Sequence, residues 1–267
     1  MKSRIAGLIA SRGAAALLAT CAAIGLGAFA VEALGSADTS GSFARPKHFP
    51  VGTGPDSVAI GDLNGDHRRD LAVANLYGHD VSVLLGRGNG TFGRRRNFGV
   101  GTGPTSVAIG DFNGDGRRDL AVADSGDGNV AILLGRGNGS FRAASYFAAD
   151  FGAEALAVGD FNGDGNPDLA VADSYLMSNS VSILLGNGDG TFGPATNFPA
   201  GFHPTSIAVG DFNRDGNPDL AVANLFGHTV SVLLGTGDGT FGARQNYPAG
   251  TSPSSVAVGD LNGDGNP

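Results

Sequence analysis

The chain has 267 residues, of which 41% are apolar and 16% are charged, with 46 glycines and a formal net charge of -8 at pH 7. The apolar content is enough to build packed cores and excludes a disordered chain. The acidic balance repels phosphate backbones and anionic bilayers at long range. Nucleic acid is therefore excluded as a partner, and metal cations are the natural counter-charge.

The first thirty residues differ from the rest of the chain. Lys2, Arg4 and Arg12 precede an Ala-rich apolar run, and Ala28 and Ala30 are the small residues that a signal peptidase reads. We predict a signal peptide over residues 1–30 and a linker over 31–42. The protein is then secreted or held at the cell surface, and is not inserted in the membrane after cleavage.

Two alternatives for this segment stay open. A permanent anchor is one, because the apolar run 14–30 has 17 residues and reaches the lower limit for spanning a bilayer. Lipidation at Cys21 is the other. Cys21 is also the only cysteine, so cleavage leaves none and excludes a disulfide framework. Bound metal is another way to stabilise an exported domain that has no disulfides.

Internal repeats decide the architecture. Four segments of 49, 49, 51 and 49 residues align, and part-repeats flank them. The repeats are 56–104, 105–153, 154–204 and 205–253, with partial copies over 43–55 and 254–267. The last copy stops inside its motif, so we expect the chain to be a fragment of a longer array.

Short strands separated by turns follow one another within each repeat. Ser57–Gly61, Leu71–Asn75 and Val81–Leu85 are five-residue apolar runs bounded by turn residues, and we expect a fourth strand from Phe92. Asn89-Gly90 before it favours a tight hairpin turn. Four strands in about 50 residues is the period of a propeller blade. The predicted fold is all-β, an incomplete β-propeller of four-stranded antiparallel blades in a domain over residues 43–267.

Other repeat folds fit less well. WD40 and kelch blades depend on Trp or Gly-Gly signatures, and the chain has no Trp and no Gly-Gly pair. Helical solenoids need a 3.6-residue period, which is absent.

The same acidic loop, D-x-N-x-D-x-x-x-D, follows the first strand of every repeat. Side-chain oxygens at positions 1, 3, 5 and 9 and a backbone carbonyl at position 7 make an all-oxygen ligand set, which calcium prefers. The predicted metal ligands are Asp62, Asn64, Asp66, Arg68 and Asp70; Asp111, Asn113, Asp115, Arg117 and Asp119; Asp160, Asn162, Asp164, Asn166 and Asp168; Asp211, Asn213, Asp215, Asn217 and Asp219; and Asp260, Asn262 and Asp264.

Two other interpretations of this loop fit less well. Asp, Asn and Gly are good turn formers, but turn chemistry does not require Asp at three odd positions in every copy. An EF-hand shares the first six positions but needs Glu at position 12, where these loops have Val, as at Val73. Position 6 must turn with positive φ. We therefore expect the Asp62 loop, which has His67 there in place of Gly, to bind calcium most weakly of the four complete loops.

The loop, the following Asp-Leu-Ala-Val-Ala (70–74), and Val-Ser-Val-Leu-Leu-Gly (81–86) with Gly-Thr-Phe (90–92) together resemble the FG-GAP and VCBS repeats of integrin-like propellers. The resemblance covers residues 43–267. It implies calcium-binding blades and a role in extracellular recognition or adhesion, with a protein or carbohydrate as ligand. The Gly-Ala-Pro of FG-GAP is Val-Ala-Asn or Val-Ala-Asp here, which puts an integrin-like ligand in doubt.

No catalytic constellation emerges, since no G-x-S-x-G elbow is present and metal accounts for the clustered carboxylates. We expect a binding protein and not an enzyme. The alternative is a scaffold or accessory domain of a larger secreted lyase or hydrolase.

Recognition is expected on the face opposite the acidic loops, where the connections differ between repeats. Aromatic side chains there suit ligand binding, although packing between blades would explain them equally well. The candidate ligand residues are Tyr77, His79, Tyr175, Phe202, His203, Phe226 and His228. The oligomeric state is open.

Overall fold

The computed structural model describes residues 45–175 and 179–265. The predicted signal peptide and linker lie outside these residues. Within the described part of the chain, no helix has the length and apolar composition needed to span a bilayer.

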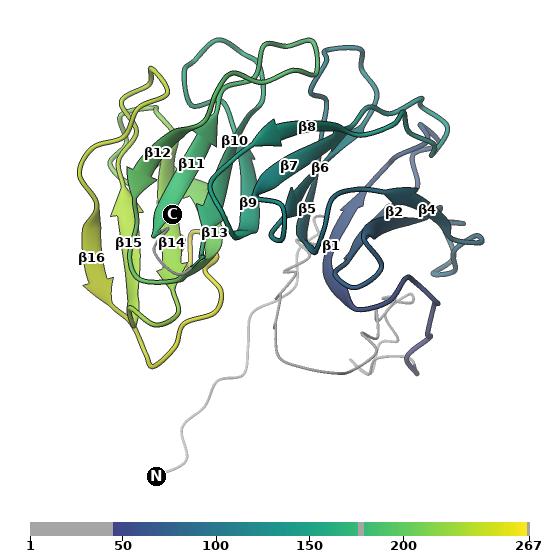
Figure 1. The fold of residues 1–267 in the computed structure, drawn as a ribbon, viewed down its shortest axis with the longest axis horizontal. Helices are drawn as coiled ribbons and strands as arrows, with labels where there is room; N and C mark the ends of the chain where they lie inside the picture. The colour runs from purple at the N-terminus through teal and green to yellow at the C-terminus, as the bar shows by residue number, and fades with distance from the viewer. Residues whose placement is uncertain (1–44, 176–178, 266–267) are drawn as a thin grey trace.

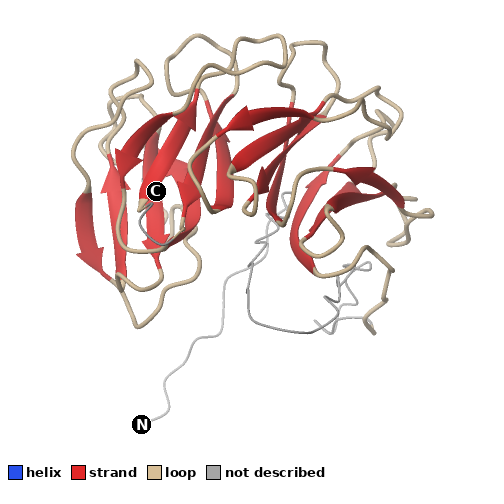
Figure 2. Ribbon diagram, in the orientation of Figure 1, coloured by secondary structure: helices blue, strands red, loops and turns tan. Residues whose placement is uncertain are grey.

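Sixteen strands account for the regular structure, and Figure 2 shows them with no helix among the described residues. Each apolar run of the sequence forms one strand because its β-branched and Ala residues fit a pleated, buried surface. The strands are β1 Pro55–Gly61, β2 Asp70–Asn75, β3 Asp80–Leu84, β4 Arg96–Gly99, β5 Pro104–Gly110, β6 Asp119–Asp124, β7 Asn129–Leu133, β8 Ser145–Ala148, β9 Ala153–Gly159, β10 Asp168–Asp173, β11 Ser180–Leu184, β12 Thr196–Pro199, β13 Pro204–Gly210, β14 Asp219–Asn224, β15 Thr229–Leu233 and β16 Gln245–Pro248.

These strands form four separate sheets, which we call blades 1 to 4 in chain order. Each sheet contains four consecutive strands, paired antiparallel in sequence order. The sheets stand side by side in a fan (Figure 1). The first strands β1, β5, β9 and β13 contact one another in succession, so they line the inner side of the fan. The all-β fold and the four-stranded antiparallel blades predicted from the sequence are confirmed.

The fourth strand begins later than expected. The prediction started it at Phe92, but β4 begins at Arg96. Phe92 forms only an isolated bridge with Gly86, directly after the turn. The chain then leaves the ladder and rejoins β3 where Val83 pairs with Arg96. The prediction of a strand from Phe92 was therefore wrong, because a hairpin signal does not show where pairing is interrupted.

The hydrophobic core lies between the blades. Three clusters of buried side chains each combine residues from two adjacent sheets. The second strands are buried along their whole length, since they pack on both faces. Leu120 and Leu169 are among the side chains with no exposed surface. Each blade therefore depends on its neighbours for burial.

Phenylalanine pairs repeat at each junction between blades. Phe98 of β4 meets Phe141 of the next blade edge to face, with 5.2 Å between ring centroids. The same contact joins Phe147 to Phe192 and Phe198 to Phe241. Phe49, which precedes β1, meets Phe92 of blade 1 in the same way at 5.0 Å. These pairs set the spacing of the sheets with a favourable ring geometry.

The connections divide between two faces of the fan. On one face, the acidic loops lie beside the Asn-Gly and Asp-Gly turns of the next blade, since Gly139 N donates to the Leu63 carbonyl and Gly190 N to the Phe112 carbonyl. On the other face, the connections between the second and third strands of the blades meet the segments that join one blade to the next. Leu225 N, for example, donates to the His203 carbonyl. Loops with different sequences thus gather opposite the acidic loops.

Candidate functional site

Exposed aromatic side chains gather on the face opposite the acidic loops. Tyr175 and Phe226 follow the second strands of blades 3 and 4, and each is more than half exposed. Phe151 and Phe202 come from the segments that lead into these blades, and their rings lie 6.2 Å from Tyr175 and 6.0 Å from Phe226. These rings pack on one another, and about half of each ring stays open to solvent.

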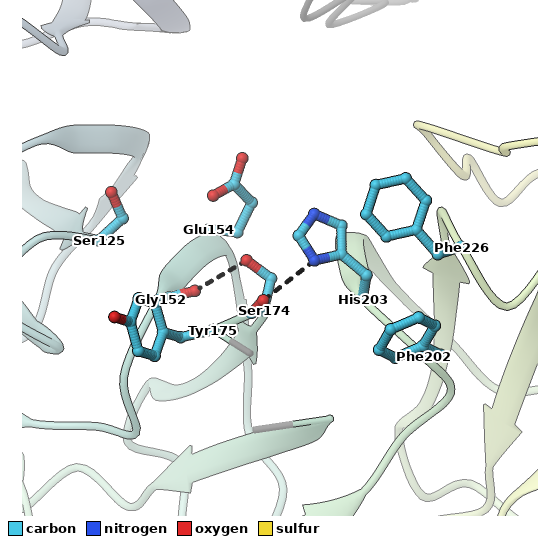
Figure 3. A pocket seen from close by; sticks show the side chains of 8 residues that line it. All are labelled: Ser125, Gly152, Glu154, Ser174, Tyr175, Phe202, His203 and Phe226. Carbon is cyan, nitrogen blue, oxygen red and sulfur yellow. Dashed lines mark hydrogen bonds between the residues drawn. The ribbon is translucent and has the colours of Figure 1, made fainter. Parts of the chain in front are cut away.

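A cavity of about 490 Å³ lies among these rings, and we call it the aromatic cavity. Its volume is that of a small-molecule site, about 300–1,000 Å³. Figure 3 shows side chains from blades 2, 3 and 4 around it. The cavity is lined by Ser125, Gly152, Glu154, Ser174, Tyr175, Phe202, His203 and Phe226.

His203 is held in a conformation that its sequence disfavours. Its φ is 60°, in the left-handed region, where the equivalent positions of the other blades have Gly54, Gly103 and Gly152. The ring stacks on Phe226 with centroids 4.6 Å apart and planes at 24°. Its Nδ1 lies 3.0 Å from the Ser174 carbonyl, which can only accept, so Nδ1 carries the proton. The bond to Ser174 and the stacking on Phe226 together fix the imidazole at the cavity.

Tyr175 is positioned by the backbone that faces it. Gly152 has φ of +77°, and a Cβ there would lie 2.6 Å from the Tyr175 backbone nitrogen. Only glycine therefore allows this close approach. Ser174 N and Oγ both donate to the Gly152 carbonyl, at 2.9 and 3.3 Å, which fixes the loop below the ring.

Glu154 brings a carboxylate to the aromatic cavity. It lies at the start of β9, and in Figure 3 it stands between Tyr175 and the His203–Phe226 pair. Burial raises its pKa, and the Asp56 carboxylate of β1 raises it further. No described residue donates a hydrogen bond or forms an ion pair with this carboxylate. Glu154 and His203 also line a second cavity, of about 390 Å³, which continues between the first strands and reaches Asp56.

The other predicted ligand residues lie outside the aromatic cavity. Tyr77 is exposed on blade 1 and covers Gly54. His79 and His228 have positive φ, and their Nδ1 atoms accept the backbone N–H groups of Gly103 and Ser252. These two histidines therefore tie their blade to the segment that follows it. Of the seven predicted residues, the structure brings together Tyr175, Phe202, His203 and Phe226.

Sequence reasoning missed Glu154. The equivalent position in each repeat is polar, with Asp56, Thr105, Thr205 and Ser254 in the other copies. A polar residue at the second position of an otherwise apolar inner strand is the signal that could have found it. Ser125 and Ser174 were missed because serine is common in any turn.

Within each acidic loop, backbone N–H groups donate hydrogen bonds to the Asp side chains and so hold the loop in place. Asp62 accepts four backbone N–H groups, the two shortest from Gly65 and His67 at 2.7 Å each. Asp66 accepts the N–H of Arg68 and the Nδ2 of Asn64. Burial tends to raise the pKa of Asp62, but the amides outweigh it and the pKa is lowered. Predicted ligand positions 1, 3 and 5 are thus held within one turn in each loop.

The Asp side chain at position 9 is buried beneath each loop. Asp70 has no exposed surface, and its two oxygens accept the N–H groups of Leu63 and Gly86. Burial is the main reason that its pKa is raised, and the Asp66 and Asp62 carboxylates raise it further. Asp119 and Asp168 repeat these contacts. The carboxylates of one loop are therefore close enough to repel one another.

The donor chemistry of the loops fits calcium, because the side chains at positions 1, 3, 5 and 9 offer carboxylate and amide oxygens. In the described part of the chain, however, no group of three or more His, Cys, Asp or Glu side chains converges in a way that could hold a metal ion. A calcium ion would have to exchange with backbone amides for the oxygens of Asp62 and its equivalents.

The loops also differ from one another. At position 6, φ is 61° for His67 and 79° to 86° for Gly116, Gly165 and Gly216, so the expected positive φ is present at a non-glycine residue. Arg214 at position 4 of the fourth loop also has a positive φ, of 64°. At position 7, Arg68 and Arg117 lie 3.8 and 3.7 Å from the carboxylates of position 5 in their own loops.

One protein family matches the sequence of this chain. The sequence profile described as FG-GAP-like repeat matches four times, over residues 62–122, 111–171, 160–222 and 213–267. No curated protein matches the chain.

Many solved structures are similar. A lectin from Agrocybe aegerita that recognises non-reducing terminal N-acetylglucosamine is 22% identical, with a TM-score of 0.51 over 79% of this chain and 59% of that one. The periplasmic gluconolactonase PpgL of Pseudomonas aeruginosa is 18% identical, with a TM-score of 0.59 over 74% and 55%. A Bacteroides uniformis protein thought to be a 6-phosphogluconolactonase is 14% identical, with a TM-score of 0.60 over 80% and 64%.

At these identities the similarity shows the fold alone, and the chain spans less than two thirds of each of these structures. The profile matches are stronger, since together they cover residues 62–267 at the spacing of the blades. The chain therefore belongs to the FG-GAP-like repeat proteins.

Proposed function

We propose that this protein is a secreted, calcium-binding propeller that recognises an extracellular ligand, a carbohydrate or a protein, through the aromatic cavity. One observation carries the proposal. Four side chains from two blades, Tyr175, Phe202, His203 and Phe226, converge on one cavity although they are spread over some fifty residues of sequence. Exposed rings on a rigid scaffold supply large contact area at low entropic cost.

The cavity supports binding better than catalysis. Ser174 Oγ donates to the Gly152 carbonyl, and His203 Nδ1 bonds the Ser174 carbonyl and not the hydroxyl. The pair therefore lacks the nucleophile–base hydrogen bond of a hydrolase. The enzymatic alternative, a scaffold or accessory domain of a larger hydrolase or lyase, predicts turnover that depends on Glu154 or His203. Lactone and glycoside hydrolysis assays on the protein would detect it.

The recognition proposal is tested with the triple variant Tyr175→Ala, Phe202→Ala and Phe226→Ala. Glycan arrays and pull-down from extracellular fractions should give ligands that the native protein binds and the variant does not. Tyr247→Ala is the matched control, because Tyr247 is equally exposed on β16 but lies outside the aromatic cavity. Equal binding by the native protein and the triple variant would contradict the proposal, provided that circular dichroism shows both folded.

Calcium is proposed to stabilise the blades and to occupy the loops unequally. The Asp160 loop should bind most tightly, because it has glycine at positions 4 and 6 and Asn166 in place of a competing arginine. The Asp62 loop, which combines His67 with Arg68, should bind most weakly. Calorimetric titration of chelator-treated protein, repeated with His67→Gly, tests this order. An unchanged weakest site in the variant would contradict it.

Export is proposed on the sequence alone. Mass spectrometry of the mature protein should find Val31 or a nearby residue at the N-terminus, whereas an intact Met1 in membrane-bound material would contradict cleavage.

A further inference from the structure

We propose that the ligand group taken up by the aromatic cavity is an alkylated ammonium, such as the trimethylammonium head of choline or a methylated amine, held between aromatic rings and the Glu154 carboxylate. The inference rests on the proposed recognition function and deepens it by naming the chemical class. Three independent features of the cavity point to an organic cation.

The first feature is an uncompensated negative charge. Glu154 is partly buried, and none of the described residues donates a hydrogen bond to it or pairs with it. Asp56 adds a second carboxylate in the cavity that continues below, and its pKa is raised by burial. No Lys or Arg lines either cavity. The Glu154 and Asp56 carboxylates repel each other, as the effect of Asp56 on the pKa of Glu154 shows, and a bound cation relieves that repulsion.

The second feature is the aromatic wall. The His203 ring lies between Glu154 and Phe226 and stacks on Phe226, with centroids 4.6 Å apart. The Phe202 centroid lies 6.0 Å from that of Phe226, and Tyr175 stands on the other side of Glu154 (Figure 3). A cation over the face of an aromatic ring is attracted by the ring quadrupole. Several rings around one site are the usual way to recognise quaternary ammonium groups.

The third feature is the conformation of His203. His203, with φ of 60°, stands where the other blades have glycine, and its Nδ1–H donates to the Ser174 carbonyl. The imidazole is thereby fixed flat on Phe226, so its ring adds to the wall.

The test compares choline with 3,3-dimethylbutanol, which has the same shape and no charge. Chemical-shift titration should show choline perturbing the Gly152 and His203 amides and binding at least tenfold more tightly than the neutral alcohol. Glu154→Gln should remove this preference. Asp189→Asn is the control for the lost charge, because it lies in a turn on the opposite face and Asn89 and Asn138 already occupy the equivalent positions.

The outcomes separate the two proposals. Equal binding of choline and the alcohol, or a preference that survives Glu154→Gln, would overturn the ammonium assignment and leave recognition by the aromatic rings standing. Binding of neither probe would also overturn it, and the array experiment with the triple variant would then decide the recognition proposal separately. Saturable binding of neutral methyl glycosides, unaffected by Glu154→Gln, would assign the cavity to carbohydrate instead.

His203→Gly provides a second measurement. Glycine is already used at this position in three blades, so the variant should fold, with a denaturation midpoint close to that of the native protein, because relief of the left-handed strain offsets the lost hydrogen bond. Choline affinity should fall at least threefold. Unchanged affinity would exclude the imidazole from the site.

Discussion

The last residue of the second strand differs between blades in its ability to donate a hydrogen bond. Blades 1 and 4 have Asn75 and Asn224, whose Nδ2 groups donate to Ser82 and Ser231. Blades 2 and 3 have Asp124 and Asp173 at these places, fully buried, each with one carboxylate oxygen that has no partner. Burial raises the pKa of Asp124 to about 7 and that of Asp173 to about 8.

A pH dependence of stability follows from these two residues. Their ordinary pKa is 3.8, so between pH 4 and pH 8 the folded protein binds more protons than the unfolded chain. The contribution of these two groups to the free energy of unfolding should therefore be greatest at about pH 4 and below. It should fall as the pH rises from there through 7 and level off above 8. Urea titrations across this range measure the slope.

Asp124→Asn should remove part of that slope and stabilise the protein at pH 8 by on the order of 2 kcal/mol. The new amide can keep the bond from Gly101 N, as Asn224 does with Gly201 N, and can also donate to the unpartnered Oδ1 of Asn129. Asp238→Asn is the matched control, because Asp238 is exposed and its pKa is lowered to about 2 by the hydroxyl groups of Thr236 and Thr240. A steeper slope in the Asp124 variant would contradict the assignment.

Arg214 is another non-glycine residue with a positive φ. It has φ of 64° at a loop position where Gly65, Gly114 and Gly163 stand in the other blades. Arg214→Gly should raise the free energy of unfolding by about 1 kcal/mol, because the left-handed strain disappears. Arg142→Gly is the control, since Arg142 replaces Gly93 and Gly242 of other repeats without a positive φ. A larger gain at Arg142 would show that loss of charge, not strain, is responsible.

At the scale of the strand, burial follows the alternation of the sequence, and the phenylalanine pairs show its effect. In β8, Phe147 faces the next blade and Tyr146 faces solvent. In β4, Phe98 packs on Phe141 in the same way.

Phe98→Ala should lower the free energy of unfolding by about 2–4 kcal/mol, because it leaves a cavity at a junction that holds two sheets together. Tyr146→Ala, which removes an exposed ring from the equivalent strand, should change it by less than about 0.5 kcal/mol. Chemical denaturation of both variants compares them. Similar losses would place the stabilising contacts within the sheets and not between them.

The second and third strands could be predicted to within a residue, because each is a short apolar run between turn residues. The fourth could not, since Arg96–Gly99 is largely exposed and has no apolar pattern of its own. Four of the cavity residues could be predicted from their position in variable connections. The polar position of Glu154 in an apolar strand is visible in the sequence, but a single sequence does not show which face of a first strand borders a cavity and which packs on a neighbour.

At the scale of the whole molecule, every blade carries an acidic loop whose carboxylates repel one another. Saturating calcium at 10 mM should raise stability by about 1.4–2.7 kcal/mol for each occupied loop if the dissociation constants lie at about 0.1–1 mM. Differential scanning calorimetry with calcium and with chelator measures the rise. Magnesium at the same concentration is the control, and an equal rise with magnesium would indicate general charge screening.

Each of the three buried clusters between blades joins only two neighbouring sheets, so the protein responds to mechanical force as a row of linked units. Pulled by its ends, it should yield one blade at a time, with neighbours holding until their own contacts break. A repeat such as 105–153 contains 49 residues, and each rupture should release about 16–18 nm of chain. If the protein tethers its ligand to a surface under flow, successive release of blades would limit the load on the aromatic cavity.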